Sequence, residues 1–160
     1  MRPNLFSELT FPTFDISDCS PMVPEDFVGI KIEAPEEVSL DGDFPIPFCG
    51  AYRLPAAITL KLSGSIIESI VVVVKDDQKH TPFSFNLRPD KDKVEGYIGG
   101  TEYPEIDEDT PVNTTGFDIG YFNIDLRTFY PDMSNRETTY IVYATLGEYV
   151  SNSVNIHMKK

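Results

Sequence analysis

The chain has 160 residues with 13 lysines and arginines against 26 aspartates and glutamates, a formal net charge of −13. That charge repels phosphate backbones and anionic lipid headgroups, so we expect neither a nucleic acid nor a membrane as partner. Thirteen prolines, 10 glycines, 8 tyrosines and 11 phenylalanines favour strands and turns over helices, and the length fits one all-β domain.

Residues 1–27 carry scattered aromatic side chains, Phe6, Phe11 and Phe14, among four prolines. Such a segment cannot sustain a helix, and its alternation is poor. Its aromatic side chains need burial, so the sequence predicts an irregular N-terminal arm packed on a β-sandwich domain of residues 28–160.

The start of the chain has no apolar run before Glu8, and no segment approaches the roughly 18 apolar residues of a membrane span. We therefore expect a cytoplasmic protein, or a secreted one if a leader was removed. Free thiols are the expected state of Cys19 and Cys49 in the cytoplasm, whereas an oxidising compartment would allow one bridge between them.

Apolar and polar residues alternate with period two in at least five segments, which is the pattern of half-buried strands. About nine strands with no helical pattern between them predict an antiparallel sandwich. Pro45 and Pro47 cannot donate ladder hydrogen bonds and so predict an edge strand or a bulge. The expected core consists of Val28, Ile30, Ile58, Leu60, Phe85, Ile124, Tyr140, Val142, Val154 and Ile156.

Residues 66–74 form the most apolar stretch, IIESIVVVV, and we interpret them as one strand. Ile66, Ile70, Val72 and Val74 would share one face, and Ile67, Val71 and Val73 the other. Apolar residues on both faces need two covers. The second cover is expected to be either the N-terminal arm or a second copy of the chain, which makes Ile67, Val71 and Val73 candidate interface residues.

Three C-terminal segments, residues 120–126, 137–144 and 151–156, resemble the last three strands of bacterial immunoglobulin-like or fibronectin-III-like domains. The resemblance covers about 40 residues and places Tyr140 at the start of the penultimate strand. It implies an immunoglobulin-like antiparallel sandwich, although the chain lacks the core tryptophan and the inter-sheet cysteine pair of true immunoglobulin domains. No function follows from this fold type alone.

A long excursion over residues 95–116 concentrates carboxylates and aromatic residues. Solvation explains such a loop most simply, but it also offers a protein-binding surface, or oxygen ligands for calcium or a carbohydrate. Calcium is the one cofactor considered, and no residue is assigned as a metal ligand. The candidate binding residues are Tyr97, Glu102, Tyr103, Glu105, Asp107, Asp109 and Phe117.

No catalytic motif is present, and His80 and His157 have no metal-ligand spacing. Asn113-Thr114-Thr115-Gly116 resembles a loop of chagasin-type cysteine-protease inhibitors without its proline, which leaves inhibition as a minor alternative. A small hydrolase using acidic residues is another alternative. The sequence favours a non-enzymatic binding or structural module that contacts a protein partner or itself.

Overall fold

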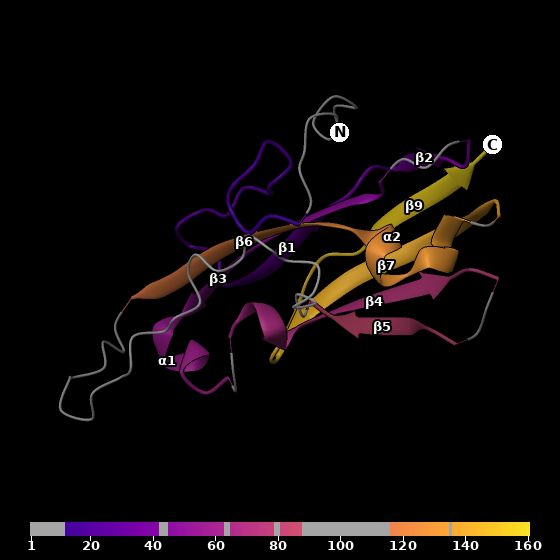
Figure 1. Cartoon of the computed structure of the whole chain (residues 1–160). Helices are drawn as coiled ribbons and strands as arrows, with labels where there is room; N and C mark the ends of the chain where they lie inside the picture. The colour runs from indigo at the N-terminus through magenta and orange to yellow at the C-terminus, as the bar shows by residue number, and fades with distance from the viewer. Residues whose placement is uncertain (1–11, 42–44, 63–64, 79–80, 88–115, 135) are drawn as a thin grey trace.

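The computed structural model describes residues 12–41, 45–62, 65–78, 81–87, 116–134 and 136–160. These residues form two β-sheets that face each other, which confirms the predicted all-β sandwich (Figure 1). Its helices are single turns, and none of the described helices is long and apolar enough to cross a membrane. They are α1 (Ala56–Thr59), α2 (Leu126–Phe129), and the 3-10 turns η2 (Ile67–Ser69) and η3 (Pro131–Ser134).

The smaller sheet contains three antiparallel strands in the order β1-β3-β6. Its middle strand β3 begins and ends with a proline, at positions where a missing N–H removes the fewest hydrogen bonds from the sheet. Next to the first proline, the Asp125 side chain accepts a hydrogen bond from the N–H of Ile46 at 2.8 Å. The strand bounds are β1 (Gly29–Glu33), β3 (Pro47–Pro55) and β6 (Phe117–Asp125).

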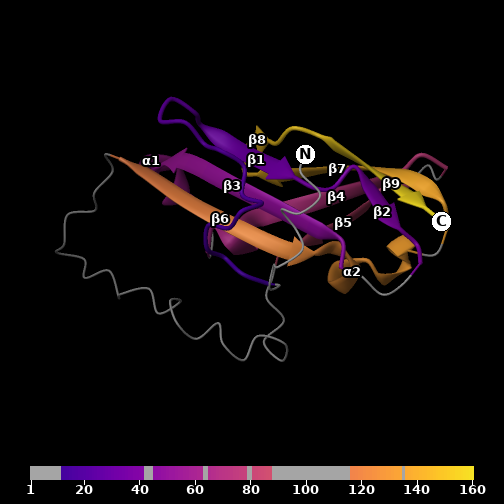
Figure 2. The ribbon, with the colours of Figure 1, turned by 90° about the horizontal axis from the view of Figure 1, so that it is seen from above.

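The larger sheet has six strands, five of them in the order β2-β9-β7-β4-β5, with β8 paired to β7. All pairs are antiparallel except β2 with β9. Figure 2 shows β3 and β6 side by side in one layer, with strands of the larger sheet in the layer behind them. The strand bounds are β2 (Glu37–Ser39), β4 (Ile70–Asp76), β5 (Phe83–Asn86), β7 (Thr138–Leu146), β8 (Tyr149–Val150) and β9 (Val154–Lys159).

The core lies between the two sheets and takes alternate residues from each strand. Tyr140, Val142 and Ile156 face Ile30 and Ile124 across it, so half of the expected core is confirmed. On β3 and β6, aromatic rings pack against glycines of the neighbouring strand. A Cβ added to Gly50 would lie 1.9 Å from the Phe122 ring, and one added to Gly120 would lie 2.1 Å from the Tyr52 hydroxyl.

Other core predictions were wrong or only partly right. Val28 is 40% exposed and Leu60 is 48% exposed, while Phe85 and Val154 are partly buried against the core. Ile58 lies in α1 rather than in a strand, because the chain turns after Pro55 and the N–H of Ala56 bonds to the carbonyl of Gly116 at 3.0 Å.

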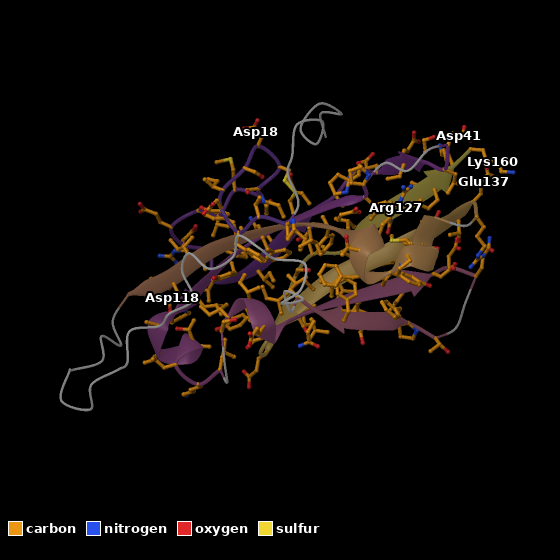
Figure 3. All side chains as sticks on the ribbon, in the orientation of Figure 1. Asp18, Asp41, Asp118, Arg127, Glu137 and Lys160 are labelled. Carbon is orange, nitrogen blue, oxygen red and sulfur yellow. A yellow bond between two sulfur atoms is a disulfide. The ribbon has the colours of Figure 1, made fainter. Side chains whose placement is uncertain are left out.

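The turn that contains α1 is tied to the start of β6. The Thr59 hydroxyl donates to the Ala56 carbonyl at 3.0 Å and contacts the Asp118 carboxylate. Figure 3 shows Asp118 beside α1. These local bonds satisfy the helical turn, so residues 58–62 alternate in sequence without forming a strand.

The edge strand or bulge predicted around Pro45 and Pro47 is found only at the start of β3. The strand begins at Pro47, where it pairs with β6 alone, and between Cys49 and Arg53 it pairs with both β1 and β6. The residues of β3 between Phe48 and Arg53 include Gly50 and Ala51, which give no alternating hydrophobic signal. The pairing of this stretch is decided by its neighbours β1 and β6.

The described part of the N-terminal arm lies on the outer side of the smaller sheet. Thr13 and Asn123 exchange two backbone hydrogen bonds, at 3.0 and 2.8 Å. A disulfide joins Cys19 to Cys49, and both are fully buried. The expectation of free thiols is therefore wrong, because the arm crosses β3 and brings the two cysteine Cα atoms within 6.0 Å.

The described part of the arm, residues 12–27, does not cover residues 66–74, because it is anchored on the other sheet. Phe6 and Phe11 lie outside the described residues. Residues 66–74 are also not one strand. The Ser65 hydroxyl accepts the N–H of Glu68 at 3.1 Å and so starts the turn η2, and β4 begins only at Ile70. In β4 the side chains alternate between buried Ile70, Val72 and Val74 and partly exposed Val71 and Val73.

Candidate functional site

The larger sheet presents a broad face to solvent, which we call the outer face. It is made by the side chains that point away from the core, as the alternating burial and the strand register define them. These residues are Glu37, Ser39, Val71, Val73, Lys75, Ser84, Asn86, Thr139, Ile141, Tyr143, Thr145, Val150, Asn155, His157 and Lys159.

The centre of the outer face is apolar. Val73 lies directly across from Tyr143, and Val150 lies across from Thr145. Ile141 is 38% exposed and lies across from Lys75 on one side and Asn155 on the other, and Val150 is 65% exposed. Cross-strand pairs such as Val73 with Tyr143 stabilise the sheet and also leave a flat apolar surface toward solvent.

Charge on the outer face differs from charge on the whole chain. Among its described positions Glu37 supplies the one carboxylate, while Lys75 and Lys159 are cations. The Lys159 ammonium bonds to the Glu37 carboxylate at 2.7 Å, and this hydrogen bond and charge hold the pKa of Glu37 below its usual value. In a chain with 26 acidic residues, the strands of the outer face thus carry one carboxylate, and exposed Asp77 and Glu137 stand just beyond the ends of β4 and β7.

Two further contacts order the polar margin of the outer face. The Lys75 ammonium lies 5.4 Å from the centre of the Tyr143 ring, within the range of a cation–π interaction. Nδ1 of His157 and the Thr139 hydroxyl share a hydrogen bond of 2.8 Å. The face therefore has an apolar centre and an ordered polar rim, the usual anatomy of a protein interface.

The outer side of the smaller sheet is different because the arm covers the part of it around Cys49 and Asn123, while Ile119 is 55% exposed beyond that part. The Asn123 side chain donates to the Thr13 hydroxyl and to the Asp15 carbonyl, both at 2.9 Å, and accepts from the Ser17 hydroxyl at 3.1 Å. Asn123 is fully buried there. The side chain of one strand thus satisfies three groups of the arm beside the disulfide.

An open groove of about 1080 Å³ lies between the arm, β1 and β9. The Asn152 side chain closes the edge of β1 there, accepting from the Ile32 N–H at 2.9 Å and donating to its carbonyl at 3.1 Å. Met22, Lys31, Glu33, Glu36 and His157 are among its lining residues. This lining mixes both charges with apolar side chains, so it favours no single ligand class.

Most of the loop site predicted from the sequence, Tyr97, Glu102, Tyr103, Glu105, Asp107 and Asp109, lies outside the described residues. Phe117 is described: it begins β6, is 45% exposed, and has the Arg53 guanidinium 3.6 Å from its ring centre. Of the predicted interface residues, Val71 and Val73 share the outer face, whereas Ile67 is buried in η2.

Sequence reasoning missed the part of the outer face that comes from β7, β8 and β9. Ile141, Tyr143 and Val150 were not proposed, because period-two alternation shows only that one face is more apolar than the other. The signal available was the absence of acidic residues from these strands. No cluster of three metal-ligating side chains occurs among the residues described.

Comparisons with known proteins give no relatives. No protein-family model matches the chain, and neither a curated protein nor a solved structure matches it.

Proposed function

We propose that this chain is a non-enzymatic binding module, built on an immunoglobulin-like sandwich of about nine strands, that contacts protein partners through the outer face. The observation that carries the proposal is the composition of that face: a flat apolar centre nearly free of carboxylates on a chain of charge −13. Depletion of charge around exposed aromatic and aliphatic residues is typical of the centre of a protein interface.

The strand order supports the immunoglobulin-like type. The order β1-β3-β6 is similar to the order A-B-E of such a sandwich, and β5-β4-β7-β9 is similar to C′-C-F-G. Tyr140, buried near the start of β7, occupies the place of the tyrosine that marks strand F. The disulfide departs from that family, because it joins a strand to the arm instead of joining the two sheets.

Affinity capture from native extract tests the proposal. The bait variants are Ile141→Lys on the outer face and Ile119→Lys on the outer side of β6. Both replace a strand isoleucine by lysine, and the two positions lie on opposite sides of the sandwich. We expect a captured partner to be lost with Ile141→Lys and retained with Ile119→Lys. Equal capture by both variants would place the binding surface elsewhere.

The competing hydrolase class is tested by a screen of glycoside and peptide substrates at several pH values. We expect no turnover above the uncatalysed rate. Reproducible turnover that disappears when a single carboxylate is changed to an amide would refute the assignment as a non-enzymatic module.

We also propose that the chain acts in an oxidising compartment, because Cys19 and Cys49 are bridged and stable disulfides are rare in reducing cytosol. To test this, the natively expressed protein is denatured without reductant and treated with an alkylating reagent, and its mass is measured by mass spectrometry. We expect no thiol to be labelled. Labelling of both cysteines would place the native chain in a reducing compartment.

A further inference from the structure

We propose that the partner seated on the outer face is a second copy of this chain, which gives a two-fold symmetric dimer of stacked larger sheets. This inference rests on the proposed function and names the partner of the same surface. A two-fold dimer uses one patch on both copies, so the patch must be compatible with itself. The outer face meets that condition in its apolar centre and in its charge.

The apolar centre is self-compatible because it is flat and made of β-branched and aromatic side chains. Val71 and Val73 stand on β4 and Ile141 and Tyr143 on the adjacent β7, and Val73 lies directly across from Tyr143. Two such surfaces stack as sheets commonly do, about 10 Å apart and rotated by about 30°. Each copy then removes the other's apolar centre from water.

Charge favours an acidic partner over a basic one. A basic protein would gain most from surfaces that carry the 26 carboxylates and would be repelled by Lys75 and Lys159. Two copies of charge −13 repel each other at long range, so close approach is favourable where carboxylates are few. Among the described residues, the outer face is such a surface, with Glu37 as its one carboxylate.

The size of the outer face fits a reversible dimer. Strand β7 has nine residues, which at about 3.4 Å each give a length of roughly 30 Å, and the four spacings of about 4.8 Å between the five strands in the row give a width of roughly 19 Å. The area of the sheet is therefore about 600 Å² per copy, below the roughly 800 Å² that each partner contributes to a standard interface, as suits a weak and reversible contact. We expect a dissociation constant in the micromolar range.

Analytical ultracentrifugation over a range of protein concentrations tests the dimer. We expect the wild type to dimerise and Ile141→Lys to raise the dissociation constant at least tenfold, with Ile119→Lys within twofold of wild type. Circular dichroism and thermal melts establish that both variants are folded. Raising the salt concentration from about 20 to 500 mM should tighten the wild-type dimer, because it screens the repulsion between acidic copies.

The outcomes separate this inference from the proposed function. A monomer at every concentration, together with partner capture that Ile141→Lys abolishes, overturns the dimer and leaves the binding face. A monomer with capture insensitive to Ile141→Lys overturns both. A dimer that resists Ile141→Lys, or that weakens as salt rises, also overturns the proposed contact.

Discussion

Strands β3 and β4 are both interior strands, yet they are buried in different ways. In β3 the first six residues, from Pro47 to Tyr52, are all buried, so both of its faces are packed. In β4 burial alternates, and Val71 and Val73 remain partly exposed. The more apolar of the two strands, IVVVVKD, therefore has one packed face, and the less apolar one, PFCGAYRLP, has two.

The difference shows that the outer side of an interior strand is packed only where another segment of the chain crosses it. The outer side of β3 carries small side chains, Cys49 and Ala51, which let the arm approach closely and anchor through Cys19 and Asn123. Among the described residues no segment crosses the outer side of β4 in this way. Apolar composition makes a cover favourable, but the anchoring residues decide where the cover lies.

The largest difference in unfolding free energy is expected between a lysine placed on the outer side of β3 and a lysine placed on the outer face of β4. Ala51 is fully buried on the outer side of β3, so Ala51→Lys forces an ammonium into a packed site and should cost about 4 kcal/mol or more of unfolding free energy. Val73→Lys on the outer face of β4 should cost about 1 kcal/mol or less, because a lysine there reaches water. Urea denaturation measures both.

Ala51→Met is the size control for that comparison, since it adds a long side chain without a charge. Its cost should lie between the two lysine variants. If Ala51→Lys and Val73→Lys destabilise equally, the outer side of β3 is not covered in solution.

Removing the disulfide tests the anchor of the cover. The bridge closes a loop with a sequence separation of 30, and the entropy of such a loop corresponds to about 3–4 kcal/mol. We expect Cys19→Ala/Cys49→Ala to lose that much stability in chemical denaturation, and reductant to have the same effect on the wild type. Reductant should leave the double variant unchanged, and a wild type insensitive to reductant would contradict the bridge.

Two asparagines on opposite faces provide a smaller, matched test. Asn123→Ala removes the side chain that bonds Thr13, Asp15 and Ser17 of the arm and should cost about 1–2 kcal/mol. Asn155→Ala on the exposed outer face should change stability by less than about 0.5 kcal/mol. Thermal melts and proteolysis near residue 15 measure the release of the arm. Equal effects would mean that the disulfide and the backbone hydrogen bonds of Thr13 hold the arm without the Asn123 side chain.

The smallest effect concerns the ion pair at the edge of the outer face. The Lys159 ammonium lowers the pKa of Glu37 in the folded chain, so its stabilising contribution is present above the ordinary glutamate pKa and is lost as pH falls through the lowered folded value. Both groups are exposed, so the change should be slight and should disappear in high salt. Melting temperatures of the wild type and Glu37→Gln across the acidic range check this. A difference that grows toward lower pH would contradict the sign.

Much of the sandwich could be predicted from the sequence. The strands β1, β6, β7 and β9 follow clear alternation, and the buried positions of Tyr140 and Val142 follow from it directly. The candidate site was only partly predictable. Val71 and Val73 were expected to form an interface, but their neighbours Ile141 and Tyr143 come from a strand 70 residues away, as the register Val73 with Tyr143 shows.

The sequence by itself determined the all-β class and the faces of the alternating strands, because period-two patterning is a local property of a pleated strand. Tertiary structure alone decided that β3 continues through Gly50 and Ala51, that residues 58–62 turn, and that Cys19 meets Cys49. These features depend on partners distant in the chain, and a stretch without alternation carries no local sign of them. The same reason explains why the described part of the arm lies on the smaller sheet and not on the outer face of the larger one.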